Sequence, residues 1–315
     1  MEPKSLCIGC DTPGKKVNNI ILFDVVNSST YLCENCGLVW RSPLPSPQQI
    51  IDYYHHQYSR YSDRIQRKIA SQQSTWLEEN IKKLKLGNNF LFIEFGAGRG
   101  WLVKEMQNKA GIMKAVGIEP DEAAVNWGKE SLGLSMDCGF VDSFNLPTEH
   151  YNSHQKIVAF SHVLEHLSDP LGALNKIKAG FHEHILFLEV PDGSLEGPVI
   201  SLPESSLGEH FWSYTQKSLI LFLEKNGYKI LTSRTTGKKS YWQKYFMDQK
   251  FLAIQDEILK QIYSKKSIGK MEFFQYGKLF LSLLNNFLLT LGLKFFPPSR
   301  LDLPSIQILA CYKNS

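Results

Sequence analysis

Residues 92–100 of the chain read FIEFGAGRG, an apolar run with one carboxylate followed by three glycines at alternate positions. A short apolar run is typical of a buried strand, and glycines directly after it let the backbone turn tightly and approach a ligand. Loops of this kind commonly hold a nucleotide-like cofactor. The spacing of the glycines, and the residues around them, indicate which cofactor it is.

The glycine spacing argues against a dinucleotide. Dinucleotide-binding loops read GxGxxG, and their third glycine lets the helix pack closely on the strand. Here Gly96, Gly98 and Gly100 read GxGxG, and Trp101 stands where the third dinucleotide glycine would be. Glu94, two residues before the loop, would repel a pyrophosphate but suits an ammonium group.

The next apolar run ends in Glu119, nineteen residues after Gly100, where a carboxylate can accept hydrogen bonds from both hydroxyls of a ribose. This combination resembles the class I S-adenosylmethionine (SAM)-dependent methyltransferases, whose first motif is (E/D)xGxGxG and whose second strand ends in an acidic residue. A generic tight turn is the structural alternative. The resemblance implies that SAM is bound by the loop and the end of the second strand, at Glu94, Gly96, Ala97, Gly98, Gly100, Glu119 and Pro120.

Three later segments resemble the same family in its own order. CGFVDSFNLP (138–147) resembles the segment that lines the adenine, which implies contacts from Asp142, as acceptor for the amino group, and Ser143. AFSHVLEHLSDP (159–170) resembles the fourth-strand motif, whose Ser161 and His162 would border the methionine part of SAM. FLEVPDG (187–193) resembles the fifth strand and its exit loop. For Glu165 and His166 we expect a structural role, because the LEH step begins a helix against the sheet.

The pattern after Phe90 predicts an α/β fold. Short apolar runs at 90–95, 115–119, 156–160 and 184–190 alternate with segments of helical spacing, which is typical of a doubly wound parallel sheet. A helix over 215–227 and strands over 228–236 and 305–313 follow. Together with the family resemblance, this pattern predicts a seven-stranded Rossmann-like methyltransferase sheet.

Composition shifts divide the chain into five parts. A Pro-rich joint, SPLPSP (42–47), separates a small Cys-rich module from helical segments, and Ser46-Pro47 predicts a helix start. The predicted parts are a zinc-ribbon module (1–42), a helical linker or lid (43–88), a SAM-binding core (89–235), a helical insertion (236–304) and the last core strand (305–315).

The insertion contains the apolar segment LFLSLLNNFLLTLGL (279–293). It is shorter than the roughly 20 apolar residues of a membrane span, and its apolar residues share one helical face. Two interpretations stay open: a helix packed on the core or on a partner subunit, or a helix that makes a peripheral membrane contact.

Four of the six cysteines form two CxxC pairs. Cys7, Cys10, Cys33 and Cys36 have the spacing of a four-sulfur zinc site, in which protein ligands fill every position and the metal is structural. Incidental cysteines and a redox pair are the alternatives. The N-terminus has no apolar segment typical of a secretion signal, so we expect a cytoplasmic, reducing location. Cys138 and Cys311 lie in apolar contexts and are expected to be packing residues.

The stretch 33–59 resembles proteins that join a zinc ribbon to a methyltransferase, a group that includes the C-methyltransferases of nucleotide-linked deoxyketosugars. The resemblance implies that Tyr53, Tyr54 and Tyr58 form part of a lid over the cofactor. Packing between domains is the alternative role for these aromatic residues.

SSLGEHFWSYT (205–215) holds the candidate catalytic residues. Glu209-His210 resembles the Glu-His pair with which sugar C-methyltransferases remove a proton beside a ketone, so His210 is the candidate general base. Those enzymes carry a tyrosine where this chain has Leu207. Tyr214 is a further catalytic candidate, and its alternative role is packing in the lid.

The charge of the chain is mild, with 35 basic and 31 acidic residues and no long basic run, which gives no support to nucleic-acid binding. The family resemblance implies methyl transfer from SAM to a small polar acceptor, with a nucleotide-sugar or glycan precursor as the expected substrate. A non-catalytic scaffold that keeps the fold, and a methyltransferase of a lipid-linked acceptor, are the alternatives. The sequence does not indicate the oligomeric state.

Overall fold

A computed structural model describes residues 6–23, 25–54, 63–141, 155–195, 210–236 and 305–313. Several predicted features lie outside these ranges: the insertion except for its first residue, the 279–293 segment, Tyr58, Asp142, Ser143 and Glu209. Among the helices that are described, none is long and apolar enough to cross a membrane.

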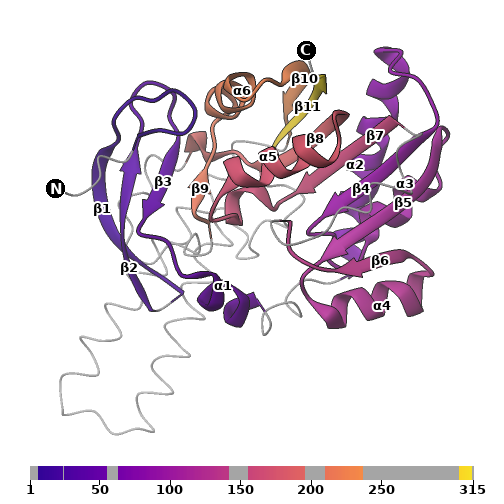
Figure 1. Cartoon of the computed structure of the whole chain (residues 1–315), viewed down its shortest axis with the longest axis horizontal. Coiled ribbons are helices and arrows are strands. Elements are labelled where there is room, and N and C mark those ends of the chain that lie inside the picture. Colours follow the sequence, from indigo (N-terminus) through magenta and orange to yellow (C-terminus); the bar gives the residue numbers. More distant parts are fainter. Residues whose placement is uncertain are drawn as a thin grey trace, which may run out of the picture. The chain divides into compact units, whose positions relative to one another are not determined.

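The larger sheet of the described chain has seven strands in the order β10-β11-β8-β7-β4-β5-β6 (Figure 1). Neighbours from β8 to β6 run parallel, whereas β11 is antiparallel to both β8 and β10. This arrangement confirms the predicted Rossmann-like methyltransferase sheet. Its strands are β4 (Phe90–Phe95), β5 (Ile112–Glu119), β6 (Ser135–Cys138), β7 (Gln155–Ser161), β8 (Glu183–Pro191), β10 (Lys229–Thr235) and β11 (Ser305–Lys313).

Helices cover both faces of this sheet, which explains why its strands read as continuous apolar runs. The core on one face contains Phe92 of β4 together with Leu77 and Val103 from helices, and the core on the other contains Leu91 of β4 and Leu174. The first face is covered by α2 (Asp63–Lys83), α3 (Trp101–Gln107) and α4 (Glu122–Leu132), and the second by α5 (Pro170–Gly180) and α6 (Gln216–Lys225). All six residues of β4 are buried.

The strand order reverses between β4 and β7, because the chain adds β5 and β6 on one side of β4 and then β7 and β8 on the other. In open α/β sheets, ligands bind at such a point, beyond the carboxyl ends of the strands. The glycine loop follows β4 and His162 follows β7, so both lie at this point.

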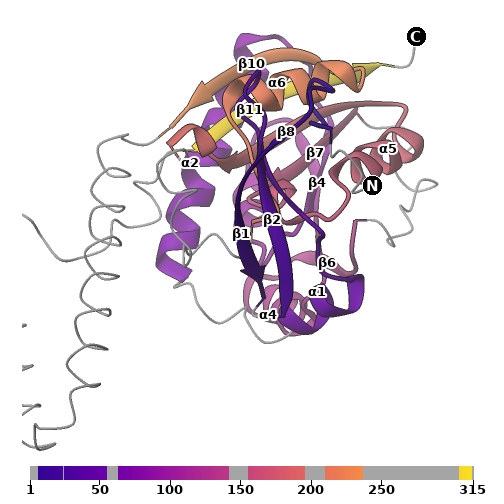
Figure 2. The ribbon, with the colours of Figure 1, turned by 90° about the vertical axis from the view of Figure 1, so that its left-hand side faces the viewer.

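The smaller sheet is antiparallel and has the order β1-β2-β3-β9 (Figure 2 views the molecule from its side). Its first three strands are β1 (Lys15–Leu22), β2 (Val26–Leu32) and β3 (Val39–Ser42), whereas β9 (Trp212–Ser213) comes from the segment that follows β8. Trp40 of β3 pairs with Trp212. The N-terminal module and the segment that follows β8 therefore share a sheet.

The apolar run 20–26 contains the end of β1 and the start of β2, and between them Phe23 has a φ of 53°. Phe23 stacks on Tyr53 with ring centroids 3.9 Å apart. This contact favours the packing role for Tyr53, and the lid role stays a prediction.

Helix α1 (Pro47–Tyr54) begins where the Ser-Pro step predicts. The Ser46 hydroxyl accepts from the Gln49 N–H at 3.3 Å, and the Gln49 side chain accepts from the Ser46 N–H at 2.8 Å. The side chains of Ser46 and Gln49 therefore each accept a hydrogen bond from the other residue's backbone N–H.

Candidate active site

The glycine loop is held in a conformation that other residues rarely adopt. Gly96, Gly98 and Gly100 have φ values of 67°, 57° and 81°. A Cβ on Gly96 would lie 2.3 Å from Cγ2 of Val163, and a Cβ on Gly100 would lie 2.5 Å from Cδ1 of Leu134. Glycine is therefore required for both conformation and space, and the loop lies directly against the segment that follows β7.

Glu119 lies at the end of β5, beside this loop, as the sequence predicts. It is 6% exposed, and its carboxylate accepts from the N–H of Gly98 at 2.8 Å and from the N–H of Asp121 at 3.1 Å. Burial raises the pKa of Glu119 to about 7, although the two backbone donors act against it. Pro120 follows directly. The contact of Glu119 with a ribose stays a prediction.

Glu94 is a buried carboxyl group before the loop, 3% exposed. Its Oε2 has no hydrogen-bond partner within the described residues. Burial and the nearby charge of Glu119 raise the pKa of Glu94 well above its ordinary value. An unsatisfied buried acceptor beside a cradle that only glycines can form fits a cofactor that carries an ammonium group and a ribose.

The ends of β7 and β8 are joined by a network that sequence reasoning missed. Gln73 donates to Ser161 Oγ at 2.7 Å and to Glu189 Oε2 at 2.8 Å, and Gln307 donates to the same Oε2 at 2.6 Å. These glutamine and glutamate side chains are all buried. Glu189 in β8 and Gln307 in β11 each interrupt an apolar run, which is the signal that could have identified them.

His162 stands between this network and the next turn of the chain. Its backbone has a φ of 55° and donates from N–H to the Glu189 carbonyl at 2.8 Å. Its Nε2 lies 3.5 Å from Glu189 Oε1, and its Nδ1 lies 3.6 Å from Glu165 Oε1. His162 is therefore placed between two buried carboxylates at the carboxyl edge of the sheet.

Glu165 lies in the 3-10 turn η3 (Leu164–His166) and is 1% exposed. Neither of its carboxylate oxygens has a hydrogen-bond partner in the part of the chain that the structure describes. Besides His162, the nearest ion-pair contact is His166 Nε2 at 3.8 Å. Burial acts to raise the pKa of Glu165. The neighbouring His162, His166 and His210 have the larger combined effect and lower this pKa to about 2. The carboxyl group is therefore ionised.

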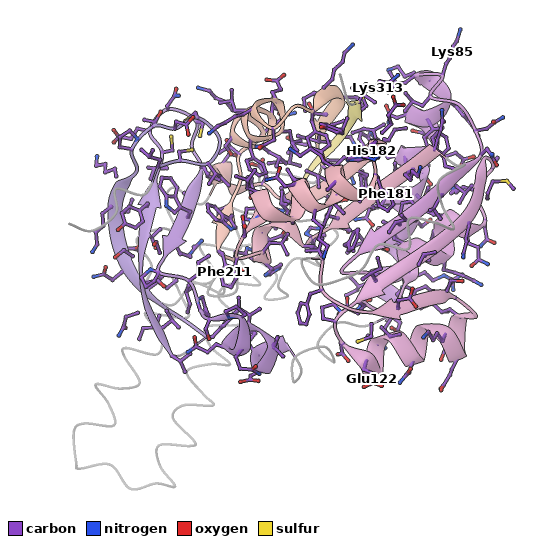
Figure 3. The ribbon with its side chains drawn as sticks, in the orientation of Figure 1. Lys85, Glu122, Phe181, His182, Phe211 and Lys313 are labelled. Atoms are coloured by element: carbon purple, nitrogen blue, oxygen red, sulfur yellow. The ribbon has the colours of Figure 1, made fainter. Side chains whose placement is uncertain are left out.

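His210 lies beside this turn. The N–H of Phe211, labelled in Figure 3, donates to the Glu165 carbonyl at 2.8 Å, and the rings of His166 and His210 meet edge-on with centroids 4.8 Å apart. Glu165 and His166, expected to be structural, are thus neighbours of the predicted base. Since Glu209 lies outside the described residues, Glu165 is the carboxylate that the structure places next to His210.

Tyr214 is 1% exposed and belongs to the apolar core, 6.3 Å from the ring of Phe222. Its hydroxyl has no hydrogen-bond partner among the described residues, and burial together with the charge of Glu165 raises its pKa well above the ordinary value. This burial favours the packing role of Tyr214 over the catalytic one.

The two CxxC pairs meet in space. Cys7 Sγ lies 3.4 Å from Cys36 Sγ, Cys10 Sγ lies 3.4 Å from Cys33 Sγ, and all four sulfurs lie within 4.8 Å of one another. Zinc–sulfur bonds of about 2.3 Å place tetrahedral sulfurs about 3.8 Å apart. The cluster therefore fits a zinc ion. In contrast, Cys138 is exposed, so its predicted packing role is wrong.

The cysteine module is bonded to the start of α6. The Thr215 hydroxyl donates to the Cys36 carbonyl at 2.7 Å, and Lys217 donates to the Asn35 carbonyl at 2.6 Å. A Cβ on Gly9 would lie 3.1 Å from the Ser218 carbonyl oxygen. The cysteine cluster is therefore fixed against the segment that carries His210.

Among solved structures, the chain is similar to the YcgJ protein from Bacillus subtilis, at 11% identity with a TM-score of 0.46, covering 78% of this chain and 99% of that one. It is also similar to the plantazolicin methyltransferase BpumL in complex with a pentazolic desmethylPZN analog and SAH, at 14% identity, a TM-score of 0.46 and coverage of 85% and 92%. Magnesium protoporphyrin IX methyltransferase from Synechocystis PCC 6803, with bound SAH, is similar at 15% identity, a TM-score of 0.41 and coverage of 62% and 84%.

No curated protein matches the sequence. A family model described as "Methyltransferase domain" matches residues 53–233, which is more than half of the 315 residues. The matched region contains the glycine loop, Glu119, the turn with Glu165 and the segment with His210.

Proposed function

The chain belongs to the methyltransferase-domain family and is a SAM-dependent methyltransferase, and we propose that its methyl acceptor is a small polar metabolite, a nucleotide-linked sugar or another glycan precursor. This substrate class is supported by a resemblance to the sugar C-methyltransferases, which is carried by the N-terminal module and the 205–215 segment. The observation that carries the proposal is the position of His210 beside Glu165. The turn that holds Glu165 follows Val163, and the Val163 side chain lies against Gly96 of the glycine loop.

In the proposed site, the cofactor supplies an activated methyl group on a sulfonium. Glu119 would hold the ribose, the unsatisfied carboxyl of Glu94 would face the ammonium group, and the glycine loop would approach both closely. Pro120, Ala97, Ser161 and His162 complete the proposed contacts. The remaining residues proposed for the adenine, Asp142 and Ser143, lie outside the described chain.

His210 is proposed to remove the proton from the acceptor, and its support is the position of its ring beside His166 and the Glu165 carboxylate. The ionised carboxylate of Glu165 would stabilise the imidazolium that forms, as a carboxylate does in other histidine-carboxylate pairs. In-line methyl transfer needs little more from the protein than orientation and this proton removal.

We also propose that a structural zinc ion binds Cys7, Cys10, Cys33 and Cys36. Its support is the tetrahedral fit of the four sulfurs. In this proposal residues 1–42 are a zinc ribbon, 43–88 a linker or lid, 89–235 and 305–315 the core, and 236–304 an insertion.

The proposal is tested by incubating the full chain with methyl-labelled SAM and a panel of nucleotide-linked ketosugars. Labelled product is expected, and His210→Ala should lower kcat by about 100-fold or more while SAH binding is unchanged. The exposed His182, labelled in Figure 3, provides a matched control, since His182→Ala should keep full activity. Full turnover by His210→Ala on a substrate that needs deprotonation would refute the base.

A further inference from the structure

We propose that Glu165, His166 and His210 form a divalent metal site at the acceptor end of the active site. One carboxylate oxygen and two imidazole nitrogens lie within 4.8 Å of one another there. Two histidines and one carboxylate, with further positions open, are the ligand set of several catalytic zinc sites and of non-haem iron sites. The inference rests on the proposed function, because it gives the metal a part in binding the methyl acceptor.

The carboxylate of Glu165 is the first observation behind the site. It is buried, and within the described residues neither oxygen has a hydrogen-bond partner. The nitrogens of His162 and His166 lie 3.6 Å and 3.8 Å from Oε1, which is beyond hydrogen-bond distance. Buried charges in proteins are paired or bind a metal. A cation between Glu165, His166 and His210 would give this carboxylate a partner at bonding distance.

The backbone holds the three ligands together independently of any metal. Glu165 and His166 are consecutive in η3, and the His166 N–H donates to the Val163 carbonyl at 2.9 Å. The hydrogen bond from the Phe211 N–H to the Glu165 carbonyl brings His210 to the same turn. Ligand atoms about 2.1 Å from a tetrahedral metal lie about 3.4 Å apart, and the three ligand atoms here lie within 4.8 Å of one another.

A second layer of residues supports the cluster. His162 lies against Glu165 on one side and against Glu189 on the other, and Gln73 and Gln307 hold the Glu189 carboxylate. Metal ligands in proteins are commonly oriented by such outer contacts. In this arrangement His162 is a positioning residue for Glu165.

The cysteine cluster and this site would select different metals. Four sulfurs select zinc, whereas one oxygen and two nitrogens also accept Mn²⁺, Fe²⁺ or Co²⁺. His166 is 19% exposed at its side chain, so the site can be reached from solvent. The open coordination positions would therefore be available to an oxygen of the acceptor.

The site narrows the acceptor to a molecule with a hydroxyl or keto oxygen at, or next to, the methylated atom. Binding of that oxygen to the metal lowers the pKa of the hydroxyl, or of the C–H beside the carbonyl, so the proton leaves to water. The acceptor atom then bonds to the methyl carbon, and the electron pair of the broken carbon–sulfur bond stays on sulfur. In the metal-bound form His210 would be a ligand, whereas in a metal-free chain it would act as the base proposed above.

Titration of the full chain, with zinc already bound at the cysteines, tests the site. Mn²⁺ is followed by electron paramagnetic resonance of the free ion, and Co²⁺ by visible absorption. One additional ion should bind per chain, and Glu165→Gln and His166→Ala should each weaken binding by about tenfold or more. His182→Ala should bind as the unchanged chain does, and SAH binding by every variant reports that the fold is intact.

Two results would overturn the metal site: no binding of either ion to the unchanged chain, or equal binding after Glu165→Gln. Labelled methyl transfer that persists without added metal and in the presence of a chelator would leave the proposed function standing with His210 as the base. Absence of both SAH binding and methyl transfer would instead reject the proposed function itself.

Discussion

The backbone N–H of Phe211 donates a hydrogen bond of 2.8 Å to the backbone carbonyl of Glu165. On the other side, the carbonyl of Phe211 accepts from the N–H of Arg41, in β3, at 3.1 Å. The residue after His210 is thus held between the turn that follows β7 and the N-terminal module. This double attachment fixes the residue after His210 between the turn that carries Glu165 and the N-terminal module.

Replacement of Gly96 by alanine should impair both folding and cofactor binding. The new Cβ would lie 2.3 Å from Val163 at a φ of 67°. We expect a loss of about 2–3 kcal/mol in the free energy of unfolding and clearly weaker SAH binding by calorimetry. Gly133→Ala is the matched control, since Gly133 has a φ of 66° but nothing within 4 Å of its Cβ position. Equal effects of the two substitutions would disprove the role of the close contact with Val163.

Cofactor affinity should rise with pH around neutrality. Burial raises the pKa of Glu119 to about 7, so its carboxyl loses its proton, and becomes a full acceptor for ribose hydroxyls, as pH rises through that value. SAH affinity should increase about tenfold between roughly pH 6 and pH 8, and Glu119→Gln should remove the dependence. Glu122→Gln, at an exposed neighbour, should keep it.

The same shift has the opposite sign for stability. The folded state binds the Glu119 proton more tightly than the unfolded state does, so this group lowers the free energy of unfolding as pH rises from about 4.5 to about 7. Chemical denaturation of Glu119→Gln and of the unchanged chain at both ends of that range would measure the difference. The free energy of unfolding of the unchanged chain should fall relative to that of Glu119→Gln as pH rises through this range, and a relative value that rises with pH would contradict the assigned shift.

Thr215 should contribute to stability through two bonds. Its hydroxyl accepts from the Ser218 N–H at 3.0 Å as the N-cap of α6, and it donates to the Cys36 carbonyl at 2.7 Å. Thr215→Val should lower the free energy of unfolding by about 1–2 kcal/mol. The exposed hydroxyl of Thr75 donates to the Ser71 carbonyl within α2. Thr75→Val should therefore lower the free energy of unfolding by only about 0.3 kcal/mol. Urea denaturation of both variants tests the comparison.

Zinc content should follow the cysteine cluster alone. The purified chain should retain about one zinc ion after dialysis, and Cys10→Ser should lose it and lower the thermal midpoint. Cys138→Ser should keep the zinc, because Cys138 is exposed and far from the cluster in sequence. Metal analysis that finds zinc retained in Cys10→Ser would count against a four-sulfur site.

The sequence was most informative where strands are buried on both faces. The predicted bounds 90–95 and 305–313 agree with β4 and β11, because continuous apolar runs are the direct consequence of helices on both sides of a sheet. The strands β6 and β9, with four and two residues, were not predicted, since so few residues show no pattern. The turn at Phe23 was missed because an apolar residue there does not signal a positive φ.

The active site could be predicted only in part for a related reason. The glycine loop and Glu119 are defined by local spacing, so they can be recognised from the sequence alone. The contact of Glu165 with His210 joins two loops whose ends meet only in the folded sheet, and no local pattern reports it. The network of Gln73 and Gln307 on Glu189 depends in the same way on three separate elements.

Calorimetric titration of the full chain with SAH tests the central claim, a SAM site at the glycine loop, most directly. The structure predicts binding of one SAH molecule per chain, strongly weakened by Gly96→Ala and preserved by Gly133→Ala. A folded chain that binds neither SAH nor SAM would contradict the account.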